Sequence, residues 1–140
     1  MAGVPFARMG ERIIEKRTAE GNFAATYERI RTALKAADFE IMTEINLADF
    51  VAKKSESYSR QCKIMVVCNA DIAHKALIVT PDAAVMLPYN VAVSEAQADQ
   101  VEIWISDPHI VWNTASNVYL KPIAEELRIR LERIIAVLRS

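Results

Sequence analysis

Two short segments of this sequence carry side chains that could do chemistry. Cys68-Asn69 stands at the end of an apolar run, and Tyr89-Asn90 follows a Leu-Pro pair. A thiol at the start of a helix can have a lowered pKa and raised reactivity, because the helix dipole favours the thiolate. The two amides and the phenol hydroxyl could instead line a pocket for a small ligand. If the two segments meet in the fold, the candidate ligand-binding residues are Cys68, Asn69, Tyr89 and Asn90.

The same side chains also have structural interpretations. Free cysteine is most often a small buried side chain, and Cys68 would fit where a strand meets a helix. Asn69 and Asn90 suit a helix cap and a turn. Cys62 and Cys68 lie six residues apart on one predicted strand, which separates them by about 20 Å and excludes a disulfide between them.

No pattern typical of an enzyme accompanies these segments. The cysteine, histidine and aspartate residues lack the spacing of a zinc site, so no metal is predicted. The three glycines form no phosphate-binding loop, and no cofactor is predicted. We therefore expect a non-enzymatic ligand-binding or regulatory domain. The alternatives are a thiol-based redox or sulfur-handling protein that acts through Cys68, and a purely structural subunit.

Composition narrows the class of protein. The length of 140 residues suits one domain, which we place at 12–140 after a flexible tail at 1–11. The net charge of −1 comes without a concentrated basic segment, which speaks against a nucleic-acid partner. No apolar run approaches the roughly 20 residues of a membrane span, and no secretory signal is recognisable, so a cytoplasmic location is expected. The mean hydropathy of +0.09 favours a surface partly covered in a homodimer.

The apolar spacing predicts the elements that position the candidate site. Period-two and near-continuous apolar runs predict strands near 12–18, 39–45, 61–68, 84–87, 90–94 and 100–106. Apolar residues three and four apart predict helices near 23–37 and from about 120 onward, with shorter ones at 47–52 and between Asn69 and Thr80. This order predicts an α+β, two-layer sandwich, with helices on one face of a mostly antiparallel sheet.

Several surface features also follow from the pattern. The near-continuous apolarity of 61–68 predicts an inner strand covered on both faces. Glu40 and Glu44 are expected to point to water, and Trp104 to point away from the core row of its strand. The polar stretch 53–60 is the longest expected loop, and the charged side of the first helix is expected to be a solvated surface.

The central stretch resembles the family known as domain of unknown function 302. The matching residues are Cys68-Asn69-Ala70, Ala73, Ala76-Leu77, Pro81 and Leu87-Pro88-Tyr89-Asn90, and Asp107-Pro108 falls where members end their last strand. Ala70 stands in place of the usual proline, and Tyr89 in place of the usual second cysteine. The resemblance implies a small α+β domain in a TATA-binding-protein-like arrangement, often paired as a homodimer. It implies no established activity.

Overall fold

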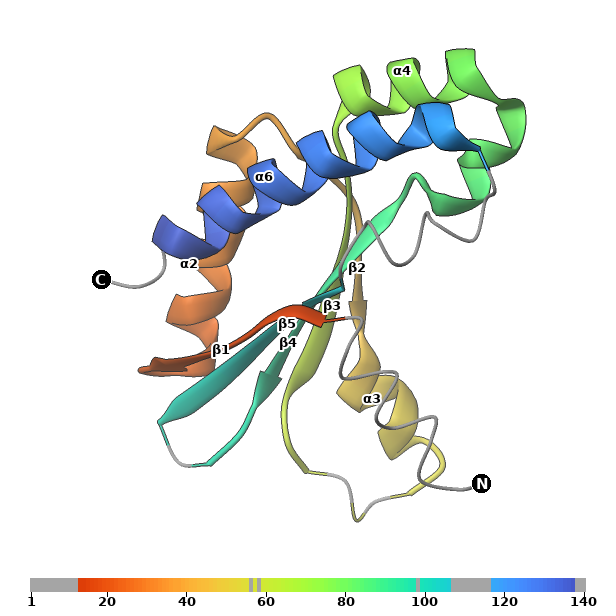
Figure 1. The fold of residues 1–140 in the computed structure, drawn as a ribbon. Helices are drawn as coiled ribbons and strands as arrows, with labels where there is room; N and C mark the ends of the chain where they lie inside the picture. The colour runs from red at the N-terminus through yellow and green to blue at the C-terminus, as the bar shows by residue number, and fades with distance from the viewer. Residues whose placement is uncertain (1–12, 56, 58, 98, 107–116, 138–140) are drawn as a thin grey trace, which may run out of the picture.

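The computed structural model describes residues 13–55, 57, 59–97, 99–106 and 117–137. Three helices lie on one side of an antiparallel sheet, and a fourth, shorter helix lies apart from them near the other end of the molecule (Figure 1). The elements are β1 (Ile13–Glu20), α2 (Phe23–Ala36), β2 (Glu40–Asn46), α3 (Leu47–Ala52), β3 (Cys62–Cys68), α4 (Ala70–Val79), η1 (Pro81–Met86), β4 (Tyr89–Glu95), β5 (Gln100–Ser106), η2 (Val118–Leu120) and α6 (Lys121–Val137). The predicted α+β class is confirmed.

The sheet has five strands in the order β1-β5-β4-β3-β2, and every neighbouring pair is antiparallel. β1 is an edge strand, and β3 is an inner strand, as the apolar run at 61–68 predicted. β2 forms the other edge. β4 and β5 are antiparallel neighbours joined by a short connection, and so form a hairpin.

The core lies between the sheet and α2, α4 and α6. Alternate residues of β3, β4 and β5 point to this side, and fully buried helix residues meet them. The largest of these buried side chains include Ile30, Leu34, Met65, Val67, Val91, Val93, Ile103, Ile105 and Leu131. Burying one such side chain contributes about 1.5–3 kcal/mol, so this layer supplies much of the drive to fold.

Local sequence explains where the helices begin and how two of them pair. The Asn22 side chain accepts a hydrogen bond from the Ala25 amide at 2.7 Å and so caps α2. Two ion pairs show that α4 and α6 run antiparallel. Lys75 of α4 pairs with Glu126 of α6 at 3.1 Å, and Arg130, one turn later on α6, pairs with Asp71, one turn earlier on α4. Within α6, Arg130 also pairs with Glu126 at 2.7 Å.

The two faces of the sheet differ in coverage. Met65 and Val67 of β3 are 0% exposed on the helix side, whereas their neighbours along the strand are only half-buried. The expectation of equal cover on both faces of β3 was therefore wrong, because α2, α4 and α6 all pack on the same side (Figure 1). We call the opposite side the outer face. It carries Cys62, Ile64, Val66, Cys68, Asn90, Ala92, Ser94, Glu102 and Trp104.

The predicted strand at 84–87 was wrong. Residues Pro81–Met86 form the 3-10 helix η1 instead. Proline at the first position of η1 presets a helical φ, and the Thr80 hydroxyl bonds the Asp82 carboxylate at the same turn. A four-residue apolar run cannot be assigned to strand or helix by periodicity alone, and here the turn residues before it decide.

Two further expectations concern the tail and the end of the sheet. The tail at 1–11 and the Asp107-Pro108 stop lie outside the described residues. Among the described helices, none combines the length and the apolar character that crossing a membrane requires.

Candidate functional site

The two segments nominated from the sequence meet at one end of the sheet. Val67 is the cross-strand partner of Tyr89, and Val66 that of Asn90, so the end of β3 lies beside the start of β4. The same pairing separates the side chains, because successive residues of a strand point to opposite faces. Tyr89 is 4% exposed on the helix side, while Asn90 is exposed on the outer face. The segments converge as expected, but of the four nominated side chains only Cys68 and Asn90 lie on the same, outer face.

Asn69 has a structural role. Its Oδ1 accepts a hydrogen bond from the Ile72 amide at 3.0 Å, which caps α4 as predicted. Its Nδ2 donates to the backbone oxygen of Asp38 at 3.1 Å and so ties the start of α4 to the turn before β2. Because the side chain is 4% exposed and both ends of the amide are engaged, Asn69 holds the two turns together.

Cys68 lies half-buried at the end of β3, across from Glu40 of β2. Burial raises the pKa of its thiol, and the negative charge of Glu40 raises the pKa further. Of the two interpretations of Cys68, the direction of this pKa shift favours the small, partly buried side chain over a thiol activated by the helix dipole. A thiol with a raised pKa is protonated near neutral pH and is a poor nucleophile, so the geometry gives the thiol-based alternative no support.

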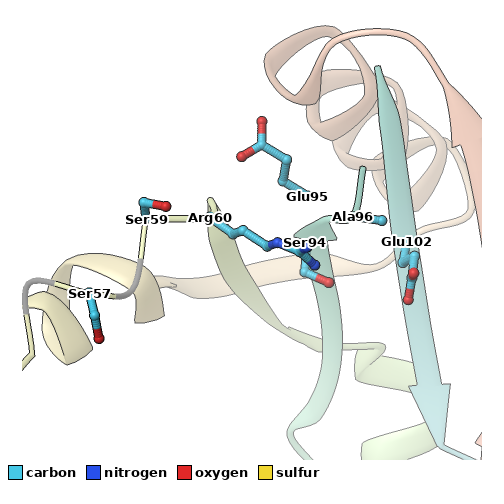
Figure 2. A pocket seen from close by; sticks show the side chains of 7 residues that line it. All are labelled: Ser57, Ser59, Arg60, Ser94, Glu95, Ala96 and Glu102. Atoms are coloured by element: carbon cyan, nitrogen blue, oxygen red, sulfur yellow. The ribbon is translucent and has the colours of Figure 1, made fainter. Parts of the chain in front are cut away.

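A polar hollow lies at the opposite end of the sheet (Figure 2). Its volume is about 360 Å³. The loop after α3 lines one side, and the ends of β4 and β5 that form the hairpin line the other. The lining residues are Ser57, Ser59, Arg60, Ser94, Glu95, Ala96 and Glu102. We call it the hairpin-end hollow.

One backbone bond and one backbone-to-side-chain bond fix the two walls of this hollow to each other. The Glu95 amide donates to the Gln61 oxygen at 2.8 Å, and the Gln61 amide donates to a Glu95 carboxylate oxygen at 3.2 Å. The loop after α3 therefore enters β3 at a set position beside the end of β4. Two smaller hollows, of about 180 and 200 Å³, adjoin this contact and share Gln61 in their linings.

The hollow carries both signs of charge. Arg60 is exposed, and no described carboxylate forms a salt bridge with it. Figure 2 shows its side chain reaching from the loop toward Ser94, with Glu95 above it in this view and Glu102 on the neighbouring strand. Beside the hollow, the Trp104 indole nitrogen donates to the Ser94 hydroxyl at 3.4 Å, so an outward tryptophan adjoins the lining, as its predicted orientation allows.

A second polar cluster joins α2 to the sheet. The Tyr27 hydroxyl donates to the Glu44 carboxylate at 2.7 Å, and the Arg31 guanidinium bonds the same carboxylate. Burial and the bond to Glu44 raise the pKa of the Tyr27 phenol. Burial acts to raise the pKa of the Glu44 carboxyl too, but the hydrogen bonds from Tyr27 and Arg31 outweigh it and hold that pKa below its usual value.

This second cluster corrects two expectations. Glu44 does not simply face water, and the charged side of α2 is not only a solvated surface, since Arg31 reaches Glu44 on β2. The Lys63 ammonium also lies 5.1 Å from the centre of the Tyr27 ring. Because these side chains contact one another, the cluster is a structural link between α2, β2 and β3.

Sequence reasoning missed the hairpin-end hollow. The signal for it was the polar stretch 53–60, interpreted only as a loop. In the described part of the chain, no group of three histidine, cysteine, aspartate or glutamate side chains is placed to hold a metal ion.

Comparison with known proteins gives a family and a fold. The profile of the family described as domain of unknown function DUF302 matches residues 14–138. A crystal structure of an uncharacterized conserved DUF302 protein from Bacillus stearothermophilus superposes with a TM-score of 0.82 at 21% identity, covering 89% of this chain and 97% of that one. No curated protein matches the sequence at a significant level. At this identity the solved structure speaks for the fold alone.

Proposed function

Because this chain belongs to the DUF302 family, whose description assigns no activity, we propose a function from its geometry. The chain is a non-enzymatic domain that binds a small polar molecule in the hairpin-end hollow and works as a homodimer. The presence of the hollow is the observation that supports ligand binding. Its volume of about 360 Å³ falls within the range of about 300–1,000 Å³ typical of small-molecule sites.

The lining suits hydrogen bonding rather than apolar burial. Three serine hydroxyls can donate or accept, Arg60 can only donate, and Glu95 can only accept when ionised. Cys68 and Asn90 also belong to the outer face, but the length of β3 sets the Cys68 end about 20 Å from this hollow. One small ligand cannot contact both ends. The proposed ligand therefore lies at the hairpin end of the sheet and not at the end that holds Cys68 and Asn90.

Trp104 provides a direct test. The chain has two tryptophans, so a Trp112→Phe background leaves Trp104, which bonds Ser94 of the lining, as the only indole. A library of amino acids, nucleosides, sugars and organic acids would be titrated while Trp104 emission and the Tm are followed. We expect at least one compound to change both in a saturable way.

Variants at the two ends of the sheet test which end binds the ligand. Arg60→Ala and Ser94→Ala should weaken that response at least tenfold, because they remove lining donors. Asn90→Ala is the matched control, since Asn90 is exposed on the same outer face at the far end. A library without any saturable response, or a response that Asn90→Ala abolishes and Arg60→Ala leaves intact, would contradict the proposal.

The homodimer part rests on the edge strand β2. Met42 is 61% exposed, Phe50 of the following helix is 67% exposed, and Ile45 is exposed as well. Among the described strands, β2 has a partner on one side only. An edge strand that pairs antiparallel with its own copy satisfies two-fold symmetry and the unpaired backbone groups together. A second copy of this chain is therefore the proposed partner.

Sedimentation tests this interface. The wild type should sediment as a dimer at micromolar concentration, and Met42→Lys should shift it toward monomer by placing two like charges near the two-fold axis. Val85→Lys is the control, because Val85 is 87% exposed on η1, away from β2. A monomeric wild type, or a dimer that Met42→Lys leaves unchanged, would count against the β2 interface.

A further inference from the structure

We infer that the hairpin-end hollow takes a small hydroxylated monocarboxylate, with its carboxylate bound by Arg60 and Ser94. This inference rests on the proposed ligand-binding function and names the chemical class of the ligand. It follows from three features of the lining: a cation without a salt bridge to the described residues, a hydroxyl with a hydrogen left to donate, and further hydroxyls around them.

Arg60 is the cation of this lining. Its side chain is exposed and forms no salt bridge with the described carboxylates, so its donors are available to a ligand. The planar fork of arginine matches a carboxylate with two parallel hydrogen bonds. Figure 2 shows the Arg60 side chain extending from the loop toward Ser94 on β4. The guanidinium is therefore placed for an anion that also reaches Ser94.

Ser94 supplies a second kind of donor beside the guanidinium. Its hydroxyl oxygen accepts from the Trp104 indole nitrogen at 3.4 Å. A hydroxyl group has one hydrogen to donate besides the positions at which it accepts, and no described residue takes the hydrogen of Ser94. Arg60 and Ser94 thus offer N–H and O–H donors to the same carboxylate, which would lie beside Trp104.

One cation sets the charge of the ligand. Glu95 is the cross-strand partner of Val101, which is buried on the helix side, and its carboxylate accepts from the Gln61 amide at 3.2 Å. In Figure 2 that carboxylate is directed away from Arg60. Glu102 lies on the outer face but already interacts within the chain. A monoanion balances Arg60 alone, whereas a phosphate carries close to two negative charges at pH 7 and would leave one unmatched.

The loop side of the lining favours hydroxyl groups on the ligand. Ser57 and Ser59 present their hydroxyls there, and that of Ser57 pairs with the Ser55 hydroxyl at 2.7 Å. Each hydroxyl has sites for a further partner, and an apolar ligand would cover them without providing one. At about 30 Å³ for each water, the hollow of about 360 Å³ corresponds to about twelve waters, which is room for one small acid.

Calorimetry with matched probes tests the assignment. Lactate, glycerate and gluconate would each be compared with the corresponding amide and with the acid that lacks the 2-hydroxyl group, and then with glycerol and inorganic phosphate. We expect at least one hydroxy acid to bind, its amide to bind about tenfold more weakly, and the acid without the hydroxyl about fivefold more weakly. Arg60→Gln should remove the difference between acid and amide, because a neutral side chain replaces the cation.

Arg128→Gln is the control, because Arg128 lies on α6 and pairs with Glu132 there, so acid binding should stay unchanged. Three outcomes would overturn the carboxylate and leave the ligand-binding proposal standing: equal binding of acid and amide, an acid preference that Arg60→Gln leaves intact, or binding confined to phosphate or to neutral compounds. If neither these probes nor the wider library bind, both proposals fail.

Discussion

Removing one oxygen atom from Tyr27 tests the link between α2 and the sheet. The Tyr27→Phe variant keeps the ring that stacks on Phe23 at 5.8 Å and that lies under Lys63, and it loses only the hydroxyl bonded to Glu44. A hydrogen bond to a charged group contributes about 1.5–3 kcal/mol. The Glu44 side chain is 32% exposed and keeps its bond to Arg31, so we expect a loss of about 1–2 kcal/mol.

The stability lost in Tyr27→Phe should depend on pH, in a direction set by the pKa of Glu44. The folded-state pKa of Glu44 is lowered, so the ionised carboxylate stabilises the fold above its unfolded pKa of about 4.3. That contribution disappears as the pH falls through the lower folded value. The difference between wild type and Tyr27→Phe should therefore be largest near pH 7 and should shrink below about pH 4.

Urea unfolding at pH 7 and at pH 3.5 measures both effects, and a calorimetric Tm should fall by about 5 °C at pH 7. Tyr119→Phe is the matched control, because Tyr119 is 72% exposed, and it should leave stability unchanged. A Tyr27→Phe variant as stable as the wild type at pH 7, or equally destabilised at both pH values, would refute the reasoning from Glu44.

Two further outcomes follow from the end of β3. Asn69→Ala should lower the free energy of unfolding in urea by about 2 kcal/mol, because it removes the cap of α4 and the bond to Asp38. Asn90→Ala should change that free energy by no more than about 0.5 kcal/mol, and equal losses in the two variants would contradict the assigned role of Asn69. At pH 7, native Cys68 should react with iodoacetamide more slowly than free cysteine does, and the reaction should become faster as the pH rises above about 8.5. Mass spectrometry follows the labelling, and fast labelling at pH 7 would show that the thiol pKa is not raised.

Much of the fold could be predicted from the residues in order. The apolar spacing of α2, β3, β4 and β5 located these elements to within one or two positions. Asn22 and Asn69 marked helix starts because capping depends on groups only a few residues away. The prediction failed at 84–87, where a short apolar run carried no period of its own.

The candidate site depended on contacts between distant parts of the chain. Tyr27 and Glu44 are 17 residues apart, and Gln61 and Glu95 are 34 apart, so no local pattern joins them. Cross-strand register alone decided that Tyr89 faces the helices and Asn90 the outer face. The raised pKa of the Cys68 thiol likewise came from burial and from Glu40 on the neighbouring strand.

Periodicity and capping act over one or two turns of chain, so the sequence by itself determined the elements, their order and the α+β class. Which face is covered, which side chains become neighbours and where a hollow opens depend on how those elements pack. Burial and electrostatic coupling are properties of that packing, and they moved the candidate site from the Cys68 end of the sheet to the end that holds Arg60 and Glu95.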